Sequence, residues 1–406
     1  MNRLRLIVSL GTLLAASQWA AGQFLPPGST PTRLVTGYSF TEGPVYDGAG
    51  GVYFTNLVFA NQAASDIIRY DIASGMAQVV DPNSGGANGL FRDANGHLVS
   101  ADQQRHQISR RSAANVATVE EVLADEWNGQ NFNSPNDLVI DRHGGIYFSD
   151  PNYSGMPGVP EAVYYGDPQG TVERLLTGFN RPNGVILSPG GGTFYLAVEG
   201  AGERRIMAYD VGPNGALSNQ REFARTNVTI NGTPINVTNG PDGLTVDAAG
   251  NVYAAVQNAV FAWNPAGQRL FDLPMPAIPT VQDPTNVTFG GPDGRTLFIT
   301  AGNSLYGIEL NVPSPQTGDY NGDGTVDAAD YTTWRDTLGA TENLSADGNG
   351  NRVIDAGDFG AWVSQFGNEL GGAASASVQT APEPSAIWLL AAAGAALTSG
   401  FARRHS

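Results

Sequence analysis

The sequence contains no cysteine and, among its 406 residues, no lysine. Without cysteine there is no disulfide, no thiol nucleophile and no Cys-ligated zinc or iron–sulfur site. Without lysine there is no Schiff-base chemistry on a side-chain amine. Charged residues make up only 15% of the chain, and they sum to a net charge of −17. Such an acidic chain lacks the basic face that nucleic-acid-binding proteins present to phosphates, so that class is excluded.

Turn-forming residues are abundant instead. The chain holds 52 glycines and 25 prolines, while 41% of its residues are hydrophobic. This composition is rich in turns but still supplies a core, which argues against wholesale disorder. A chain of 406 residues is also long enough for two or more domains.

The N-terminal segment has the pattern of an export signal. Two arginines precede an apolar run at residues 6–16, and three small residues follow at 20–22. This order is typical of a secretory signal peptide over residues 1–22, cut before Gln23. The alternative is an uncleaved anchor helix, which the shortness of the apolar run disfavours.

The C-terminal segment, residues 382–406, begins with Pro-Glu-Pro, continues with an apolar stretch at 386–402, and ends in an arginine-rich cluster. This three-part order resembles the PEP-CTERM bacterial sorting signal, whose tail is recognised and removed by a membrane protease of the exosortase type. The alternative is a plain tail anchor, because the stretch is about the shortest able to cross a bilayer. Both ends predict export from a bacterial cytoplasm, to the periplasm, cell envelope or medium, with membrane contact only through the terminal segments.

Residues 23–311 repeat one pattern: an apolar strand, a turn rich in Asp and Gly, and a second strand with Tyr or Phe, as in VIDRHGGIYFSDP. The turns are spaced 44 to 59 residues apart and lie near Asp47, Asp93, Asp141, Ser188, Asp247 and Gly291. A period in the forties with hairpin turns is typical of propeller blades. The sequence therefore predicts an all-β, six-bladed β-propeller, and the regular self-similarity disfavours a β-sandwich. The long fifth repeat predicts an extra hairpin around an Asn-Gly turn at 231–232.

A column of carboxylates and carboxamides lies five residues before these turns. Its six members are Glu42, Asn88, Asn136, Asn183, Asp242 and Asn286. In a closed propeller, equivalent strand starts converge on the central axis, so we expect these oxygens to face one funnel. Two of them carry negative charge, and buried carboxylates without counter-ions are costly unless a cation is bound. Hard oxygen ligands favour Ca²⁺, Mg²⁺ or Mn²⁺ over zinc. The alternative is a repeated turn that caps each blade.

The motifs FTEGPVYD, SPNDLVIDRHGGIYFSDP, RPNGVILSP and GPDGLTVDAAGNVY carry a resemblance. The segment resembles the gluconolactonase / senescence marker protein (regucalcin) family of six-bladed propellers. The resemblance implies one axial divalent cation, calcium first, with magnesium, manganese or zinc also possible. The ligands it implies are Glu42, Asn136, Asn183 and Asp242. It leaves Asn88 and Asn286 to line the pocket and contact substrate directly or through water.

Family chemistry is the opening of a sugar lactone to the aldonic acid. A dication can polarise the ring carbonyl, and a neighbouring carboxylate can take the proton of the attacking water. The resemblance implies Asp242 for this role. His97, His106 and His143 fall outside the column, which disfavours a histidine-dyad mechanism. Two alternatives stay open: a non-catalytic propeller that binds a ligand or partner, and a related propeller esterase or phosphotriesterase.

Other polar residues are candidates for supporting roles. The second strands of three blades run back towards the column and end at Asp102, Asp150 and Glu199, which either orient the ligands or solvate strand ends. Asn133, just before the SPND motif, is a candidate contact for a substrate hydroxyl. Related bacterial sequences often carry Lys and Arg where Gln130 and Asn131 stand here, so a cationic substrate contact is lost.

Residues 319–369 hold ten acids and two arginines, after a short linker at 312–318 and before another at 370–381. Two loops place oxygen donors at positions one, three, five, seven, nine and twelve of an EF-hand-like calcium site. The donors are Asp319, Asn321, Asp323, Thr325, Asp327 and Asp330 in the first loop, and Asp347, Asn349, Asn351, Val353, Asp355 and Asp358 in the second. Helix-like stretches at 331–338 and 359–366 follow. The module resembles a type I dockerin, which implies two calcium ions and a cohesin-like partner; the alternative is a calcium-stabilised spacer.

Overall fold

The structure is a computed structural model of the chain. It describes residues 24–60, 65–93, 95–153, 159–226, 229–230, 233–234, 240–276, 283–292, 294–312, 314, 318–321, 326–340, 346 and 353–366. The predicted signal peptide, the linker at 370–381 and the predicted sorting signal lie outside the described residues. Within the described ranges, no helix is both long enough and apolar enough to cross a membrane.

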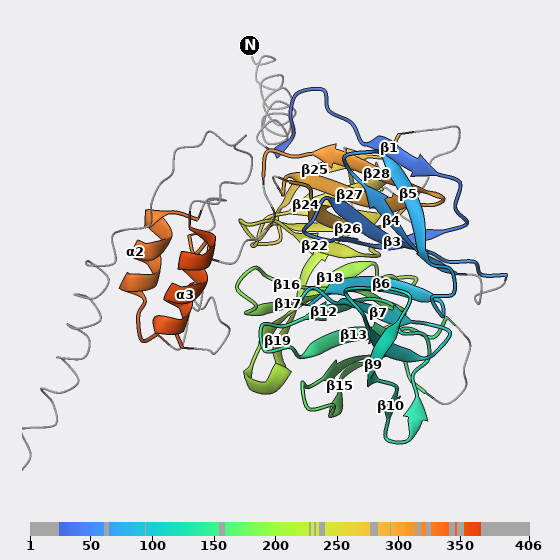
Figure 1. Cartoon of the computed structure of the whole chain (residues 1–406), viewed down its shortest axis with the longest axis horizontal. Coiled ribbons are helices and arrows are strands. Elements are labelled where there is room, and N and C mark those ends of the chain that lie inside the picture. Colours follow the sequence, from blue (N-terminus) through green and yellow to red (C-terminus); the bar gives the residue numbers. More distant parts are fainter. Residues whose placement is uncertain are drawn as a thin grey trace, which may run out of the picture.

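Six four-stranded antiparallel sheets surround a central axis (Figure 1). The first sheet comprises β2 (Thr41–Tyr46), β3 (Gly51–Asn56), β4 (Asp66–Asp71) and β5 (Met76–Asp81). The second comprises β6 (Ala87–Arg92), β7 (Leu98–Asp102), β8 (Gln107–Arg111) and β9 (Val119–Ala124). The third comprises β12 (Leu138–Ile140), β13 (Ile146–Asp150), β14 (Ala162–Gly166) and β15 (Val172–Thr177).

The next two sheets repeat this order. The fourth comprises β16 (Pro182–Leu187), β17 (Thr193–Val198), β18 (Arg205–Val211) and β19 (Leu217–Arg225). The fifth comprises β22 (Leu244–Val246), β23 (Val252–Val256), β24 (Ala259–Trp263) and β25 (Arg269–Pro274). Smaller elements are the paired β10 (Glu126–Trp127) and β11 (Gln130–Asn131), the paired β20 (Thr229–Ile230) and β21 (Thr233–Pro234), and a 3-10 turn, η2 (Pro213–Gly215). The pairing of β20 with β21 confirms the predicted extra hairpin.

The sixth sheet combines the two ends of the propeller. It comprises β26 (Pro284–Gly290), β27 (Thr296–Ala301), β28 (Ser304–Glu309) and, as its outer strand, β1 (Thr32–Thr36). Because β1 pairs antiparallel with β28, the start of the domain is hydrogen-bonded to its end. The ring is therefore closed by the chain itself, and the prediction of an all-β six-bladed propeller is confirmed.

The first strand of each sheet contacts the first strands of both neighbouring sheets. These contacts join β2, β6, β12, β16, β22 and β26 into a closed ring. Equivalent positions at the starts of these strands are thereby gathered at one end of the axis. The predicted convergence of the column follows from this arrangement.

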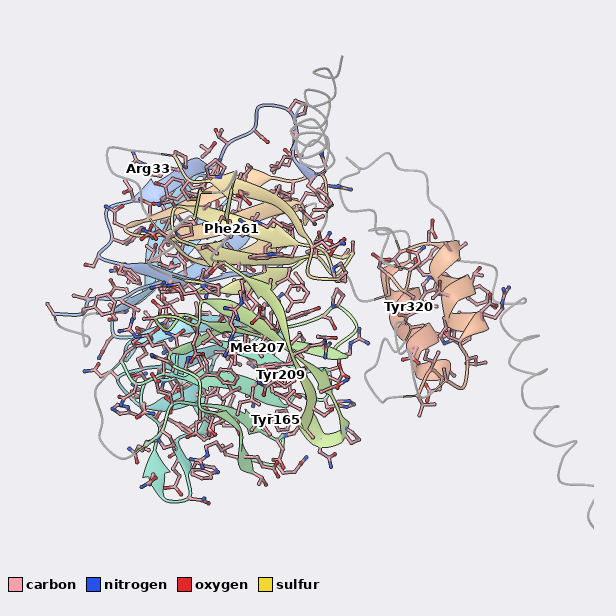
Figure 2. All side chains as sticks on the ribbon, turned by 180° about the vertical axis from the view of Figure 1, so that it is seen from behind. Arg33, Tyr165, Met207, Tyr209, Phe261 and Tyr320 are labelled. Atoms are coloured by element: carbon pink, nitrogen blue, oxygen red, sulfur yellow. The ribbon has the colours of Figure 1, made fainter. Side chains whose placement is uncertain are left out.

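Apolar side chains fill the space between neighbouring sheets. Between the third and fourth sheets, Tyr165, Met207 and Tyr209 belong to one buried cluster, and Figure 2 shows them in this part of the propeller. In the same cluster, the ring of Tyr147 lies with its centroid 4.9 Å from that of Phe194. Strands such as β14 are buried along their whole length, which explains their nearly continuous apolar sequence. This packing makes the blades a rigid frame for the axial residues.

The turns between first and second strands are built around aspartates. Asp47 Oδ1 accepts hydrogen bonds from the backbone N–H groups of Ala49 and Gly51, and Asp141 accepts from His143 and Gly145 in the same way. An aspartate at this position replaces backbone partners that a tight turn cannot supply. The recurrent Asp of the sequence pattern is therefore structural and lies at the opposite end of the inner strands from the column.

Two helices follow the propeller, α2 (Ala328–Asp336) and α3 (Ala356–Gln365). They pack against each other around a small core that includes Tyr320, drawn apart from the propeller in Figure 2. Each begins with a capping box, Asp327 with Asp330 in α2 and Asp355 with Asp358 in α3. Both helices begin three residues earlier than predicted, because these aspartates bind the backbone N–H groups of the first turn.

The two halves of this helical module mirror each other in their contacts. The indole N–H of Trp334 donates to the Asp355 carbonyl, and that of Trp362 donates to the Asp327 carbonyl, both at 2.7 Å. Asp330 is fully buried, and one of its oxygens accepts from the Tyr320 N–H at 2.7 Å. The predicted loop positions Asp323, Thr325, Asp347, Asn349 and Asn351 lie outside the described residues. Calcium binding and the dockerin resemblance therefore stay predictions.

Candidate functional site

A pocket of about 300 Å³ opens where the inner strands begin. Five of the six column residues line it: Glu42, Asn88, Asn136, Asn183 and Asp242. They come from five different blades: three are the second residues of β2, β6 and β16, and the other two lie two residues before β12 and β22. The site thus exists only because the propeller is closed.

The two column carboxylates lie close enough to affect each other. Glu42 is 4% exposed, and burial raises its pKa to about 8, helped by the charges of Asp137 and Glu199. Burial, followed by the charge of Glu42, raises the pKa of Asp242 well above its ordinary value. Among the described residues, no arginine or histidine pairs with either carboxylate. Two acids in this position repel each other, and a bound cation would relieve the repulsion.

The amides of the column supply further oxygens. Asn88 is 3% exposed, and its buried Oδ1 has no hydrogen-bond donor among the described residues. A buried carbonyl oxygen without a hydrogen-bond partner is unfavourable. Such an oxygen is free to coordinate a cation or to accept a hydrogen bond from a bound molecule. In the described part of the chain, no three His, Cys, Asp or Glu side chains are grouped for metal binding. The column residues on the pocket lining are a different kind of group, because two carboxylates combine there with asparagine amides. Carboxylate and amide oxygens are both ligands for a hard dication.

A third buried carboxylate, Asp137, lies beside the column and was not predicted. It occupies the position that follows the column residue, where four other blades have glycine. A Cβ on Gly43 would lie 2.1 Å from the Asn88 carbonyl, and one on Gly184 would lie 2.2 Å from the Asp242 carbonyl. Neighbouring inner strands therefore approach too closely for a side chain at these glycines. The sequence signal was available: aspartate breaks a run of glycines in an aligned column.

Asp137 is held from two sides. Its carboxylate accepts the N–H of Val185 at 3.2 Å, and it also accepts a hydrogen bond from the Asn286 side chain. Burial raises the pKa of Asp137 to about 7. The same Asn286 amide bonds Glu42, while its Oδ1 accepts from the Val287 N–H at 2.8 Å. Asn286 is thus bound at both ends and lies off the pocket lining, as a link between two carboxylates.

Asn133 also lies off the lining. Its backbone N–H and its side-chain NH₂ both donate to Asp150 Oδ2, at 2.8 and 3.2 Å. Asp150 accepts from the Ser134 N–H at 2.7 Å as well, and burial raises the pKa of Asp150 to about 7. Because Ser134 lines the pocket two residues before Asn136, Asp150 fixes the loop that carries one column amide. These contacts favour the orienting role over solvation of a strand end, the two predicted alternatives for Asp150, and the role itself stays a prediction.

Asp102 and Glu199 have different surroundings. Asp102 is fully buried, and its oxygens lie 3.3 Å from Arg111 and 3.4 Å from Arg105, so its contacts tie it to the second blade. Glu199 instead lines the pocket and accepts a hydrogen bond from Tyr153 at 2.6 Å. Of the three strand-end acids, Glu199 alone reaches the pocket, and Tyr153 joins it as a lining residue that the sequence did not reveal.

The remaining wall of the pocket is apolar. Phe40, Leu57 and Phe59 line it from the first blade, with the two phenyl centroids 5.2 Å apart. Phe59 lines the pocket and is 62% exposed, so much of its ring faces solvent at the pocket opening. The pocket therefore joins a charged floor to one hydrophobic side.

The histidines lie elsewhere, as predicted. His97 contacts the turn residue Asp93 at 3.0 Å, and His106 Nδ1 lies 2.8 Å from the Asn133 carbonyl. His143 is exposed in the third-blade turn. None of the three lines the pocket.

Known proteins share this propeller. A family model described as the SMP-30/gluconolactonase/LRE-like region matches residues 40–303. A gluconolactonase from Zymomonas mobilis is 27% identical over 300 residues, which cover 68% of this chain and 80% of that protein. A pentonolactonase from Haloferax volcanii is 29% identical over 169 residues, 41% of this chain and 52% of that protein.

Two solved structures extend the comparison. A gluconolactonase from Xanthomonas campestris has a TM-score of 0.61 at 26% identity, covering 72% of this chain and 92% of that one. The calcium-binding protein regucalcin from Agrobacterium tumefaciens has a TM-score of 0.57 at 19% identity, covering 71% and 97%, a likeness of fold alone. The family match spans nearly the whole propeller, including the pocket residues of all its lining blades. The chain belongs to the SMP-30/gluconolactonase/LRE-like family.

Proposed function

We propose that this protein is an exported, metal-dependent hydrolase that opens a sugar lactone to the aldonic acid. The observation that carries the proposal is the pair of carboxylates, Glu42 and Asp242, buried together on the floor of an axial pocket without a cationic partner among the described residues. Family membership supports the reaction class, since relatives are named gluconolactonase and pentonolactonase.

Four residues would hold the divalent cation: Glu42, Asn136, Asn183 and Asp242. Their donors are carboxylate and amide oxygens, which favour calcium first and leave magnesium, manganese or zinc possible. Asn88 Oδ1, which also lies on the pocket lining without a hydrogen-bond partner among the described residues, adds support for a cation site there. A dication held by these residues would supply a Lewis acid that polarises the lactone carbonyl and favours the negative charge developing on its oxygen.

Asp242 acts as the general base in this proposal. It accepts a proton from a water that attacks the lactone carbonyl carbon, and the tetrahedral centre collapses by breaking the ring carbon–oxygen bond. The ring oxygen takes up that proton and becomes the hydroxyl of the open-chain acid. The causes that raise the pKa of Asp242, burial and nearby negative charge, also make its ionised form a stronger base.

The walls of the pocket suit a sugar ring. Phe40 and Phe59 present apolar surface to carbon–hydrogen faces, while Glu199 and Asn88 offer polar atoms to hydroxyl groups. Such a division between one apolar side and a few directed polar groups is typical of small-molecule sites. It supports a small polyhydroxylated lactone as the substrate class.

The test is hydrolysis of glucono-δ-lactone by the full chain, measured by acid release above the spontaneous background. We expect activity with a divalent cation, loss of activity after chelation, and recovery when calcium or manganese is added back. A panel of phosphotriesters and simple esters run in parallel identifies the related hydrolase class. Absence of lactone hydrolysis with every divalent cation would overturn the proposal.

Export and anchoring form a second part of the proposal. Residues 1–22 would direct secretion and residues 382–406 would be processed by an exosortase-type protease, which the mass of the mature protein and its cell fraction would test. The module at 319–369 would bind two calcium ions, and the capping boxes of α2 and α3 support the expected loop–helix units. Calcium titration of the full chain and binding to a cohesin would test this module.

A further inference from the structure

A tyrosine outside the predicted column bonds to one of its amides. Asn183 Nδ2 lies 3.1 Å from the hydroxyl oxygen of Tyr153, and that hydroxyl donates to Glu199 Oε2 at 2.6 Å. All three residues line the pocket, and Tyr153 comes from the loop that follows β13. A continuous chain of contacts therefore runs from a carboxylate through the tyrosine to the amide.

The direction of these hydrogen bonds fixes how the amide is turned. A tyrosine hydroxyl has one proton, and Tyr153 donates it in its hydrogen bond to Glu199 Oε2. The Tyr153 oxygen is left as an acceptor, so Asn183 presents its NH₂ group to it. The Asn183 side chain also hydrogen-bonds the Asp242 carboxylate, a second acceptor. Both neighbours thus demand the NH₂ group, and the amide oxygen is left for another partner.

The surrounding loops hold Tyr153 in place. Glu161 accepts the backbone N–H of Asn152 at 3.0 Å and that of Arg181 at 3.2 Å, which joins the loop before Tyr153 to the loop before Asn183. The Arg181 guanidinium carbon lies 5.5 Å from the centroid of the Tyr153 ring. The tyrosine is therefore fixed from its backbone and from its ring face as well as through its hydroxyl.

We propose that Tyr153 is a positioning residue that turns Asn183 Oδ1 towards the axial cation. An amide oxygen ligates a hard dication, whereas an amide NH₂ group does not, so the opposite orientation would remove one of the four ligands. Glu199 contributes by accepting the one hydrogen bond that the Tyr153 hydroxyl can donate. This inference rests on the proposed cation site, because Asn183 acts here only as a ligand of that cation.

Calorimetric titration of the metal-free full chain with Ca²⁺ tests the proposal. The axial component is the one that Asp242→Ala abolishes, which separates it from binding by the helical module. Tyr153→Phe should weaken that component by roughly 10- to 100-fold, the usual effect of losing a group that orients a metal ligand. Tyr209→Phe is the matched control, because Tyr209 lies in the same blade as Asn183 and its buried hydroxyl has no partner among the described residues. It should leave the axial affinity unchanged.

A second background separates orientation from a general structural role. Asn183→Asp offers an oxygen whichever way the side chain is turned, so adding Tyr153→Phe to it should cost no further calcium affinity. An equal loss in both backgrounds, or no loss in the wild-type background, would overturn the role assigned to Tyr153. A wild-type isotherm without any component that depends on Asp242 would instead remove the cation site itself, and with it the metal part of the proposed function.

Discussion

Buried acids at the two ends of the inner strands have different partners. At the turn end, Asp47 accepts two backbone N–H groups and pairs with Arg69 at 2.6 Å, and Asp247 accepts from Asn251 and Tyr253. At the pocket end, Glu42 and Asp242 face each other's charge without an arginine or histidine among the described residues. The same residue types are satisfied at one end and left uncompensated at the other.

This contrast separates acids with a structural role from acids with a functional role. Acids that build turns need fixed donors, and the propeller supplies these from the same hairpin. Acids that hold a cation must lack a positively charged protein partner, since an arginine in that position would compete with the metal. Asp102 marks the boundary: it ends a strand at the pocket end but is paired with Arg111, and it lies off the pocket lining.

The largest expected effect comes from exchanging one acid at each end for its amide. Asp242→Asn removes the proposed base and should lower kcat/KM for glucono-δ-lactone by about 10²- to 10⁴-fold. Asp247→Asn disturbs hydrogen bonds of a turn and should leave kcat/KM within about twofold of wild type while lowering the free energy of unfolding by about 1–3 kcal/mol. Steady-state kinetics and urea denaturation measure both. Similar kinetic losses in the two variants would erase the distinction between the ends.

The next largest effect should come from removing the arginine that pairs with two buried acids. Arg111 is fully buried and pairs with both Asp81 and Asp102. Arg111→Leu leaves these carboxylates without a cation and should lower the free energy of unfolding by about 3–5 kcal/mol. The folded fraction should keep the wild-type kcat/KM, because Arg111 does not line the pocket. Unchanged stability in urea denaturation would show that buried acids here do not need cations.

Calcium should stabilise the protein more as pH rises. In the metal-free protein the pKa of Glu42 is about 8 against an ordinary 4.5, so its protonated form contributes stability that is full below about pH 4.5 and is lost as pH rises through 8. Calcium needs the ionised carboxylates, so its benefit grows over the same window, to about 2.7 kcal/mol at a hundredfold excess over Kd. Thermal melts with and without calcium at pH 5.5 and 8.5 measure this.

The control for that measurement is Asp242→Asn. It retains any calcium binding by the helical module but lacks an axial carboxylate, so its calcium-dependent shift in Tm should vary less with pH. A wild-type shift that is the same at both pH values would contradict a cation held by Glu42 and Asp242.

The smallest expected effect concerns the apolar wall. Phe59→Ala removes a ring that is already 62% exposed, so it should cost substrate binding about 1 kcal/mol, or roughly a fivefold rise in KM. The value of kcat should stay near wild type because the ring lies away from the carboxylates. Phe289→Ala, by contrast, removes a ring from the core between blades and should reduce stability rather than substrate binding. A fall in kcat for Phe59→Ala would indicate that the wall takes part in the reaction.

The repeat explains why much of the site could be predicted from sequence. Glu42 and Asp242 occupy a register position that recurs in every blade, and a closed ring of inner strands must bring that position together. The closure by β1 could not be predicted, because its short sequence matches no repeat and gains its partner only from β28. Pairing at that distance depends on the finished ring.

Residues outside the repeat were missed for the same reason. Tyr153 lies in an irregular loop, and its role depends on Asn183 and Glu199, which come from another blade. Asp102 looked like its counterparts Asp150 and Glu199, but its partner Arg111 follows on the next strand, and strand alternation alone does not say which groups meet. The shared register correctly placed five of its six residues on the pocket lining, with Asn286 as the exception, and it carried no information on contacts that single loops determine.

The most direct test of the central claim is a crystal structure of the full chain grown with Ca²⁺. We expect one cation on the propeller axis with oxygens of Glu42, Asn136, Asn183 and Asp242 at about 2.3–2.6 Å, the usual calcium–oxygen distance. Water alone at that position, with the two carboxylates sharing a proton, would contradict it.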